Sequence, residues 1–131
     1  MTPDQHAEAA EALLQAEASG QQCGLLSLRY PGMTLDDAYA VQKALVARKL
    51  AEGRRKIGWK IGLTSRAMQD ALKIDTPDSG VLLDDMLFIN GATVPAGRFI
   101  QPRIEAEIAF IMKAPLAGAE CTRADVLMAT E

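Results

Sequence analysis

The sequence is poor in the residues that build disulfide scaffolds, histidine sites and membrane spans. It holds two cysteines, Cys23 and Cys121, without a CxxC spacing, so neither a disulfide framework nor a zinc site is indicated. The single histidine, His6, is expected at the surface. No apolar run approaches the roughly 20 residues that span a bilayer, and the acidic beginning of the chain does not resemble a signal peptide. We therefore expect a cytoplasmic protein without a membrane partner.

An excess of basic charge is also missing. The formal net charge is -3 at pH 7, whereas a nucleic-acid-binding face needs clustered lysine and arginine. The one dense basic run, Arg54-Arg55-Lys56, is typical of solvated charge at the end of a helix. What is present is ordinary for a globular domain, with 49% hydrophobic and 24% charged residues among 131. A nucleic-acid partner is not expected.

Helix signals occur at four places. A capping-box pattern at Thr2 opens a helix that Gly20 ends, and Thr34 opens another that Gly53 ends. A short helix is expected over residues 65–72. The pattern from Thr122 to Asp125 starts a last helix, which reaches Glu131 without a glycine, a proline or a basic final turn. A helix interrupted in this way predicts a truncated chain.

Strand signals fill the middle of the sequence. From Lys56 to Gly62 the apolar and polar residues alternate with a period of two. Residues 75–80 are dense in turn formers and predict an ordered loop. Further strands are expected at 81–83, 86–89 and 104–112, with Asn90-Gly91 as a hairpin-type turn. Together with the helices, this order predicts an α/β (α+β) fold.

Two glutamates stand two residues apart in the last predicted strand. Glu105 and Glu107 would share one face of it with Arg103, roughly 6.6 to 6.8 Å apart along the strand. Their carboxylates could converge on a hard cation such as Mg²⁺ or Mn²⁺. On spacing alone, an exposed charged face with Arg103 as the counter-ion is the commoner arrangement. Both interpretations stay open at this point.

Lys60 and Asp78 are the other candidates for chemistry. Lys60 is flanked on its own strand face by Gly58 and Gly62, and glycines inside a strand often mark the close approach of a ligand. A lysine in a pocket can act as an acid or base once burial lowers its pKa. Asp78 lies in a loop that a proline and a glycine would make rigid. A surface lysine and an aspartate that only caps a turn are the competing interpretations.

Taken in order, these segments resemble one family, the hydratase/decarboxylase branch of the fumarylacetoacetate hydrolase superfamily, whose members act in meta-cleavage pathways of aromatic compounds. The resemblance covers almost the whole chain. It rests on Gly58-Trp59-Lys60-Ile61-Gly62-Leu63-Thr64-Ser65, Pro77-Asp78-Ser79-Gly80, Leu83-Asp84-Asp85-Met86, Arg98-Phe99-Ile100 and Pro102-Arg103-Ile104-Glu105-Ala106-Glu107.

The resemblance implies a site and an architecture. It makes Lys60 and Asp78 the catalytic residues and makes Glu105 and Glu107 two metal ligands, with Mg²⁺ as the ion and Mn²⁺ as a possible substitute. The third ligand, a glutamate, would lie beyond Glu131, which is not assigned to that position. Residues 1–80 would form an N-terminal α/β subdomain carrying the lysine, and residues 81–131 would begin a mixed β-sheet.

The implied activity is metal-dependent hydration of a 2-oxo-alkenoate or 2-hydroxydienoate, of the 2-oxohept-3-ene-1,7-dioate type, by a homo-oligomeric lyase. Decarboxylation of a 4-oxalocrotonate-type substrate is the first alternative. The second is an incomplete fragment that only folds, associates or binds metal weakly. Hydrolysis of a carbon–carbon bond is disfavoured, because His6 is badly placed to activate water.

Overall fold

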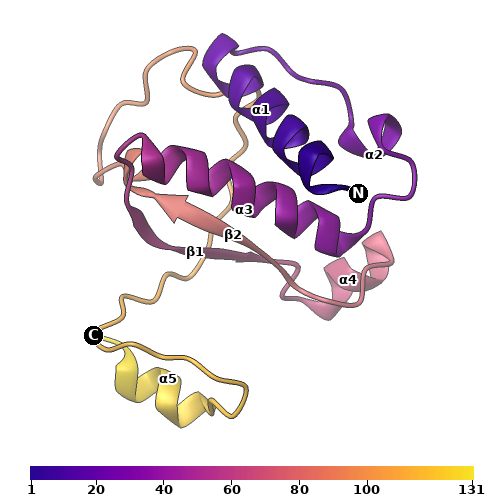
Figure 1. Cartoon of the computed structure of the whole chain (residues 1–131). Helices are drawn as coiled ribbons and strands as arrows, with labels where there is room; N and C mark the ends of the chain where they lie inside the picture. Colours follow the sequence, from indigo (N-terminus) through magenta and orange to yellow (C-terminus); the bar gives the residue numbers. More distant parts are fainter. The chain divides into compact units, whose positions relative to one another are not determined.

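A computed structural model describes Met1–Glu131 and divides the chain into two compact units, Met1–Ile100 and Gln101–Glu131 (Figure 1). The predicted boundary between residues 80 and 81 falls inside a strand, whereas the units divide after Ile100. The chain contains helices and one small antiparallel sheet, in agreement with the predicted α+β class. No helix combines the length and the apolar character needed to cross a membrane.

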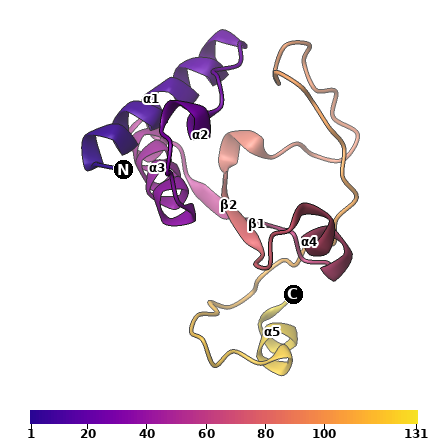
Figure 2. The ribbon, with the colours of Figure 1, turned by 90° about the vertical axis from the view of Figure 1, so that its right-hand side faces the viewer.

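Two long helices form one side of the first unit (Figure 1 and Figure 2). They are α1 (Pro3–Ser19) and α3 (Leu35–Ala51), and both begin at the predicted positions. The capping box predicted at Thr2 is present, and a second one, for which only a helix start was predicted, occurs at Thr34. Their small core consists of Ala9, Ala10, Tyr30 and Val41. The stretch before Pro31, which carries no helix signal in the sequence, forms the short helix α2 (Leu26–Arg29).

The two helices are also joined by polar contacts at their N-terminal ends. Oδ1 of Asp37 lies 2.8 Å from the amino group of Met1 and 2.8 Å from Nε2 of His6. The amino group is the main reason that the pKa of Asp37 falls far below its ordinary value of 3.8, and hydrogen bonds from Thr34 and His6 lower it further. His6 was expected at the surface, but its side chain is partly buried and 19% exposed.

The sheet of the first unit is a two-stranded antiparallel ribbon of β1 (Lys56–Gly62) and β2 (Asp78–Leu83). Helix α4 (Arg66–Leu72) lies in the connection, capped by the Ser65 hydroxyl. The predicted strand at 81–83 exists, but it begins earlier, so that 78–80 is strand and not loop. Strand pairing with β1 outweighs the local turn preferences of these residues.

The chain after β2 differs from expectation. The predicted strand over 86–89 is absent, and Asp84–Met86 instead form the 3₁₀ turn η1. The Asn90-Gly91 turn is present: Gly91 has φ 81°, and the amide of Ala92 donates to the carbonyl of Ile89 at 3.0 Å. This turn joins two irregular segments and not two strands.

The second unit contains helix α5 (Arg123–Ala129) and no β-strand. The long strand predicted over 104–112 is therefore wrong for this chain, where only Met112 forms a β-bridge, with Thr130. A strand needs a neighbour to satisfy its peptide groups, and the apolar side chains at the alternate positions from Ile104 on need a core to pack against. Neither is supplied here, and Ile104 is 100% exposed.

The end of α5 also differs from the sequence prediction. The helix begins with the predicted capping box at Thr122, but it stops at Ala129. The Thr130 hydroxyl donates to the carbonyl of Val126 at 2.7 Å, and the amide of Glu131 donates to the carbonyl of Ile111 at 2.8 Å. The helix therefore ends at Ala129, and the last residue bonds back to the segment that precedes the helix.

Candidate active site

Two of the predicted site residues lie on one face of the β1–β2 ribbon. In the antiparallel register, Lys60 is opposite Gly80 and Gly62 is opposite Asp78. Directly opposed residues project to the same face, and so do residues two apart on one strand. Lys60 and Asp78 are therefore diagonal neighbours on a shared face. From the sequence, only the family resemblance assigned Lys60 and Asp78 to the same site. Neither segment by itself predicts how the two strands are aligned.

Helix α3 fixes the outer edge of β2 beside Asp78 (Figure 1 and Figure 2). The side-chain amide of Gln42 donates to the carbonyl of Ser79 at 3.0 Å and accepts from the amide of Val81 at 3.0 Å. The hydroxyl of Tyr39 accepts from the amide of Ser79 at 3.1 Å. Gln42 thus bonds β2 much as a neighbouring strand would, and it satisfies backbone groups that an edge strand leaves unpaired.

Replacing Gln42 tests this edge contact. In Q42A, the carbonyl of Ser79 and the amide of Val81 both lose their partner, and the free energy of unfolding should fall by about 1 to 3 kcal/mol. Hydrogen exchange at the Val81 amide should accelerate. Q42E is the matched control: its carboxylate can still accept from Val81 but cannot donate to Ser79, so it should protect the Val81 amide better than alanine does. Unchanged exchange at Val81 in Q42A would contradict the role of Gln42.

The end of β1 is held in an unusual backbone conformation. Leu63, which follows Gly62 directly, has φ 54°, in the left-handed region that residues with a side chain rarely occupy. The side-chain amide of Gln69 donates to the carbonyl of Leu63 at 2.7 Å. Helix α4 therefore helps to hold the turn where the chain leaves the Lys60 face. A strained residue of this kind often lies next to a functional site.

The surroundings of Lys60 and Asp78 differ from those expected. Both residues are exposed in this chain, whereas a pocket was expected around Lys60. Glu105 and Glu107 lie in the second unit, on a segment without regular secondary structure, and both are exposed. The chain contains no group of three histidine, cysteine or acidic residues placed to hold a metal ion. The carboxylates retain the donor chemistry that suits Mg²⁺.

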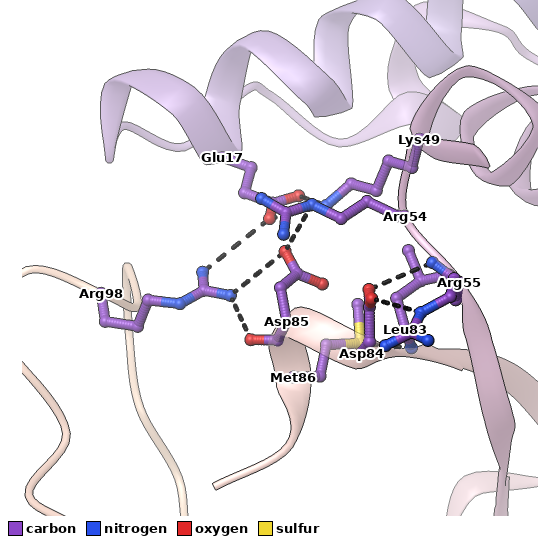
Figure 3. Close-up of polar contacts among 9 residues, drawn as sticks. All are labelled: Glu17, Lys49, Arg54, Arg55, Leu83, Asp84, Asp85, Met86 and Arg98. Atoms are coloured by element: carbon purple, nitrogen blue, oxygen red, sulfur yellow. Dashed lines mark hydrogen bonds and ion pairs between the residues drawn. The ribbon is translucent and has the colours of Figure 1, made fainter. Parts of the chain in front are cut away.

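A network of charged side chains, which no sequence signal indicated, links α1, α3 and η1 in the first unit (Figure 3). Lys49 is only 6% exposed, and its ammonium group lies 2.7 and 2.6 Å from the two carboxylate oxygens of Glu17. Arg98 reaches Glu17 at 3.9 Å and Asp85 at 3.7 Å, and Arg54 reaches Asp85 at 3.6 Å. The partners are far apart in the sequence, so no local spacing of residues predicts these ion pairs.

This network borders a hollow of about 500 Å³ in the first unit. Its wall carries acidic and basic side chains in equal number, Glu11, Glu17, Glu52 and Asp85 beside Arg48, Lys49, Arg54 and Arg98. Most of these charges form ion pairs with one another. None of the four predicted site residues lines the hollow, so we do not identify it with the candidate active site.

The sequence of this chain is similar to those of known hydratases. No family model matches the chain. The chain is 52% identical over 126 residues to 2-oxo-hept-4-ene-1,7-dioate hydratase of Escherichia coli, a match that covers 96% of the chain and 47% of the relative. It is 44% identical over 131 residues to 2-keto-4-pentenoate hydratase of Paraburkholderia xenovorans (strain LB400), covering 100% of the chain and 49% of that relative.

The fold of the chain is also similar to that of a solved relative. A solved structure of 4-oxalocrotonate decarboxylase from Pseudomonas putida G7, complexed with magnesium and adipate, superposes with a TM-score of 0.94 at 37% identity. That match covers 100% of the chain and 50% of the decarboxylase, so the chain spans about half the length of the relatives it matches. By sequence and by fold, the chain is thus related along its whole length to the hydratase/decarboxylase branch of the fumarylacetoacetate hydrolase superfamily, as its motifs predicted.

Proposed function

We propose that the full-length protein is a metal-dependent hydratase that adds water to a 2-oxo-alkenoate or 2-hydroxydienoate in the catabolism of aromatic compounds. The observation that carries the proposal is the 52% identity to a hydratase of this class along 96% of the chain. The register of β1 and β2, which puts Lys60 and Asp78 on one face, supports it independently. A cytoplasmic location and a homo-oligomeric state stay predictions.

Two side chains of this sequence have the chemistry that hydration requires. Water addition across the double bond places a hydroxyl on the carbon two bonds beyond the oxo group and a proton on the carbon next to the oxo group. One group must therefore accept a proton from water and another must deliver one to the carbon skeleton. Lys60 and Asp78, diagonal neighbours on one face, are the pair that we assign to these transfers.

The metal would be held in part by Glu105 and Glu107, whose oxygen donors suit Mg²⁺ and, less specifically, Mn²⁺. When bound, such an ion would act as a Lewis acid on the 2-oxo acid. The magnesium and calcium complexes of the related decarboxylase support a divalent ion. A further ligand would have to come from outside these residues, which contain no group of three suitable side chains.

The activity is tested with full-length protein, Mg²⁺ and an unsaturated 2-oxo-diacid. The relative's name places the double bond at carbon 4, whereas the resemblance first suggested carbon 3, so both isomers should be supplied. We expect a 4-hydroxy-2-oxo acid by proton NMR from both isomers and no release of CO₂. The carbon-3 isomer should also lose the absorbance of its conjugated double bond. The carbon-4 isomer must first move a proton from carbon 3 to carbon 5, which brings its double bond into conjugation with the oxo group. Incubation without Mg²⁺, with a chelator present, is the control. Formation of CO₂ in place of the hydrated product would contradict hydration.

Decarboxylation is the second candidate, and one observation favours it. The solved structure with the TM-score of 0.94 is a decarboxylase, and a curated 4-oxalocrotonate decarboxylase is 40% identical to the chain. Both identities are lower than that to the hydratase of Escherichia coli. CO₂ release from the same substrates distinguishes the two activities directly.

The remaining alternative is that these 131 residues alone only fold, associate or bind metal weakly. With Glu105 and Glu107 as the assigned ligands, we expect the isolated chain to bind Mg²⁺ far less tightly than a full site. Calorimetric titration with Mg²⁺ measures this, with E105Q/E107Q as the control. Tight binding that survives in the control would contradict the assignment of the two glutamates.

A further inference from the structure

The glycines on the Lys60 face differ in what a side chain would meet. A β-carbon on Gly80 would meet nothing within 4 Å, and one on Gly58 would lie 3.9 Å from Cδ1 of Leu82, an ordinary contact. A β-carbon on Gly62 would overlap Oδ1 of Asp78 and lie 3.2 Å from its Cγ. Of these three glycines, only Gly62 has no room for a β-carbon while the Asp78 carboxylate keeps its position.

The requirement comes from the carboxylate and not from the backbone. Gly62 does not have a positive φ, so its conformation is open to any residue. It is paired directly with Asp78, and the carboxylate of Asp78 lies across β1 over the α-carbon of Gly62. A side chain at position 62 would therefore push the carboxylate away while leaving the strand pairing possible, because the clashing atom is the end of a rotatable side chain.

From this we infer that Gly62 is a positioning residue: its bare α-carbon lets the Asp78 carboxylate lie across β1, toward the Lys60 position on the same face. The inference deepens the proposed function and rests on it, since it presumes that Asp78 transfers a proton. Proton transfer requires hydrogen-bond reach, so a carboxylate displaced by the width of a methyl group should transfer poorly.

The inference is tested by a cycle of full-length variants: wild type, G62A, D78A and G62A/D78A. General acid–base groups contribute about 10²- to 10⁴-fold to turnover, so D78A should lower kcat by about 100-fold or more. G62A should lower kcat by about 10-fold or more, with KM nearly unchanged. In G62A/D78A the alanine at 62 has no carboxylate to displace, so kcat should equal that of D78A.

The control is G58A, which adds the same methyl group to the same strand and the same face at an ordinary contact distance. Its kcat should stay close to that of wild type. Circular dichroism should show that G62A is folded. If G62A fails to fold, G62A/D78A must restore folding, because it removes the overlapping carboxylate.

The outcomes distinguish the catalytic role of Asp78 from the positioning role of Gly62. Wild-type turnover in D78A would contradict the proposed role of Asp78 and, with it, the proposed mechanism. Reduced turnover in D78A with wild-type turnover in G62A would leave that role intact and overturn the inference about Gly62. Effects of G62A and D78A that multiply in the double variant would also overturn it, because they would show that Gly62 acts through something other than Asp78.

Discussion

Replacing Lys60 with alanine in the full-length protein should lower kcat by about 100- to 10,000-fold, the range that a general acid or base contributes. Lys60 stands on the face that it shares with Asp78, in the centre of β1, where strand pairing with Gly80 holds its backbone. Its removal should therefore leave the fold intact and remove one of the two proton-transferring groups. Steady-state hydration kinetics measure the effect.

K60R separates acid–base chemistry from simple charge. Arginine keeps a positive charge but does not give up its proton near neutral pH, so K60R should be nearly as impaired as K60A. K56A is the control for losing a lysine from the same strand, since Lys56 lies over the Trp59 ring at 5.0 Å and has no assigned catalytic role. Substantial turnover in K60R would show that Lys60 acts as a fixed charge, and unchanged turnover in K60A would refute its role.

Replacing Glu17 with glutamine should lower the free energy of unfolding by about 2 to 3 kcal/mol. The ammonium group of Lys49 is almost fully buried and is bonded to both oxygens of Glu17. Removing one partner of a buried pair leaves an uncompensated charge, at a cost of about 3 to 5 kcal/mol. The side chain of Glu17 is 40% exposed, so water can compensate part of that cost.

Urea denaturation followed by circular dichroism measures the loss. E17Q/K49M should recover most of the stability, because methionine fills the space of the lysine without bringing a buried charge. E52Q serves as the control, since Glu52 is an exposed acidic residue at the end of α3. Stability of E17Q equal to that of E52Q would show that the Lys49–Glu17 pair contributes little.

Local signals in the sequence predicted α1, α3, α4 and the start of α5, but not α2. The capping boxes at Thr2, Thr34 and Thr122 each depend on residues three apart, and all three are present. The alternation of Lys56 to Gly62 likewise predicted β1, because a period of two is a property of the strand itself. The family resemblance rests on the order of several short motifs along the chain, and it agrees with the sequence and fold comparisons.

The sequence could not predict what depends on distant partners. The strand expected at 104–112 has the right pattern but no neighbour to pair with in this chain. Conversely, 78–80 resembled a loop and became strand because β1 is there to pair with it. The Lys49–Glu17 pair joins residues 32 apart, so no local spacing could have revealed it. The roles of Lys60, Asp78, Glu105 and Glu107 stay predictions.

The side chains of Gln42 and Tyr39 have a consequence for the way this sheet can grow. They already bond the peptide groups of Ser79 and Val81 that an added strand would need. A third strand, from the same polypeptide or from another molecule, is thus directed to the opposite edge, beside β1. Helix α3 thus leaves the β1 edge of the ribbon open to a further strand, and it hinders strand pairing at the outer edge of β2, the strand that carries Asp78.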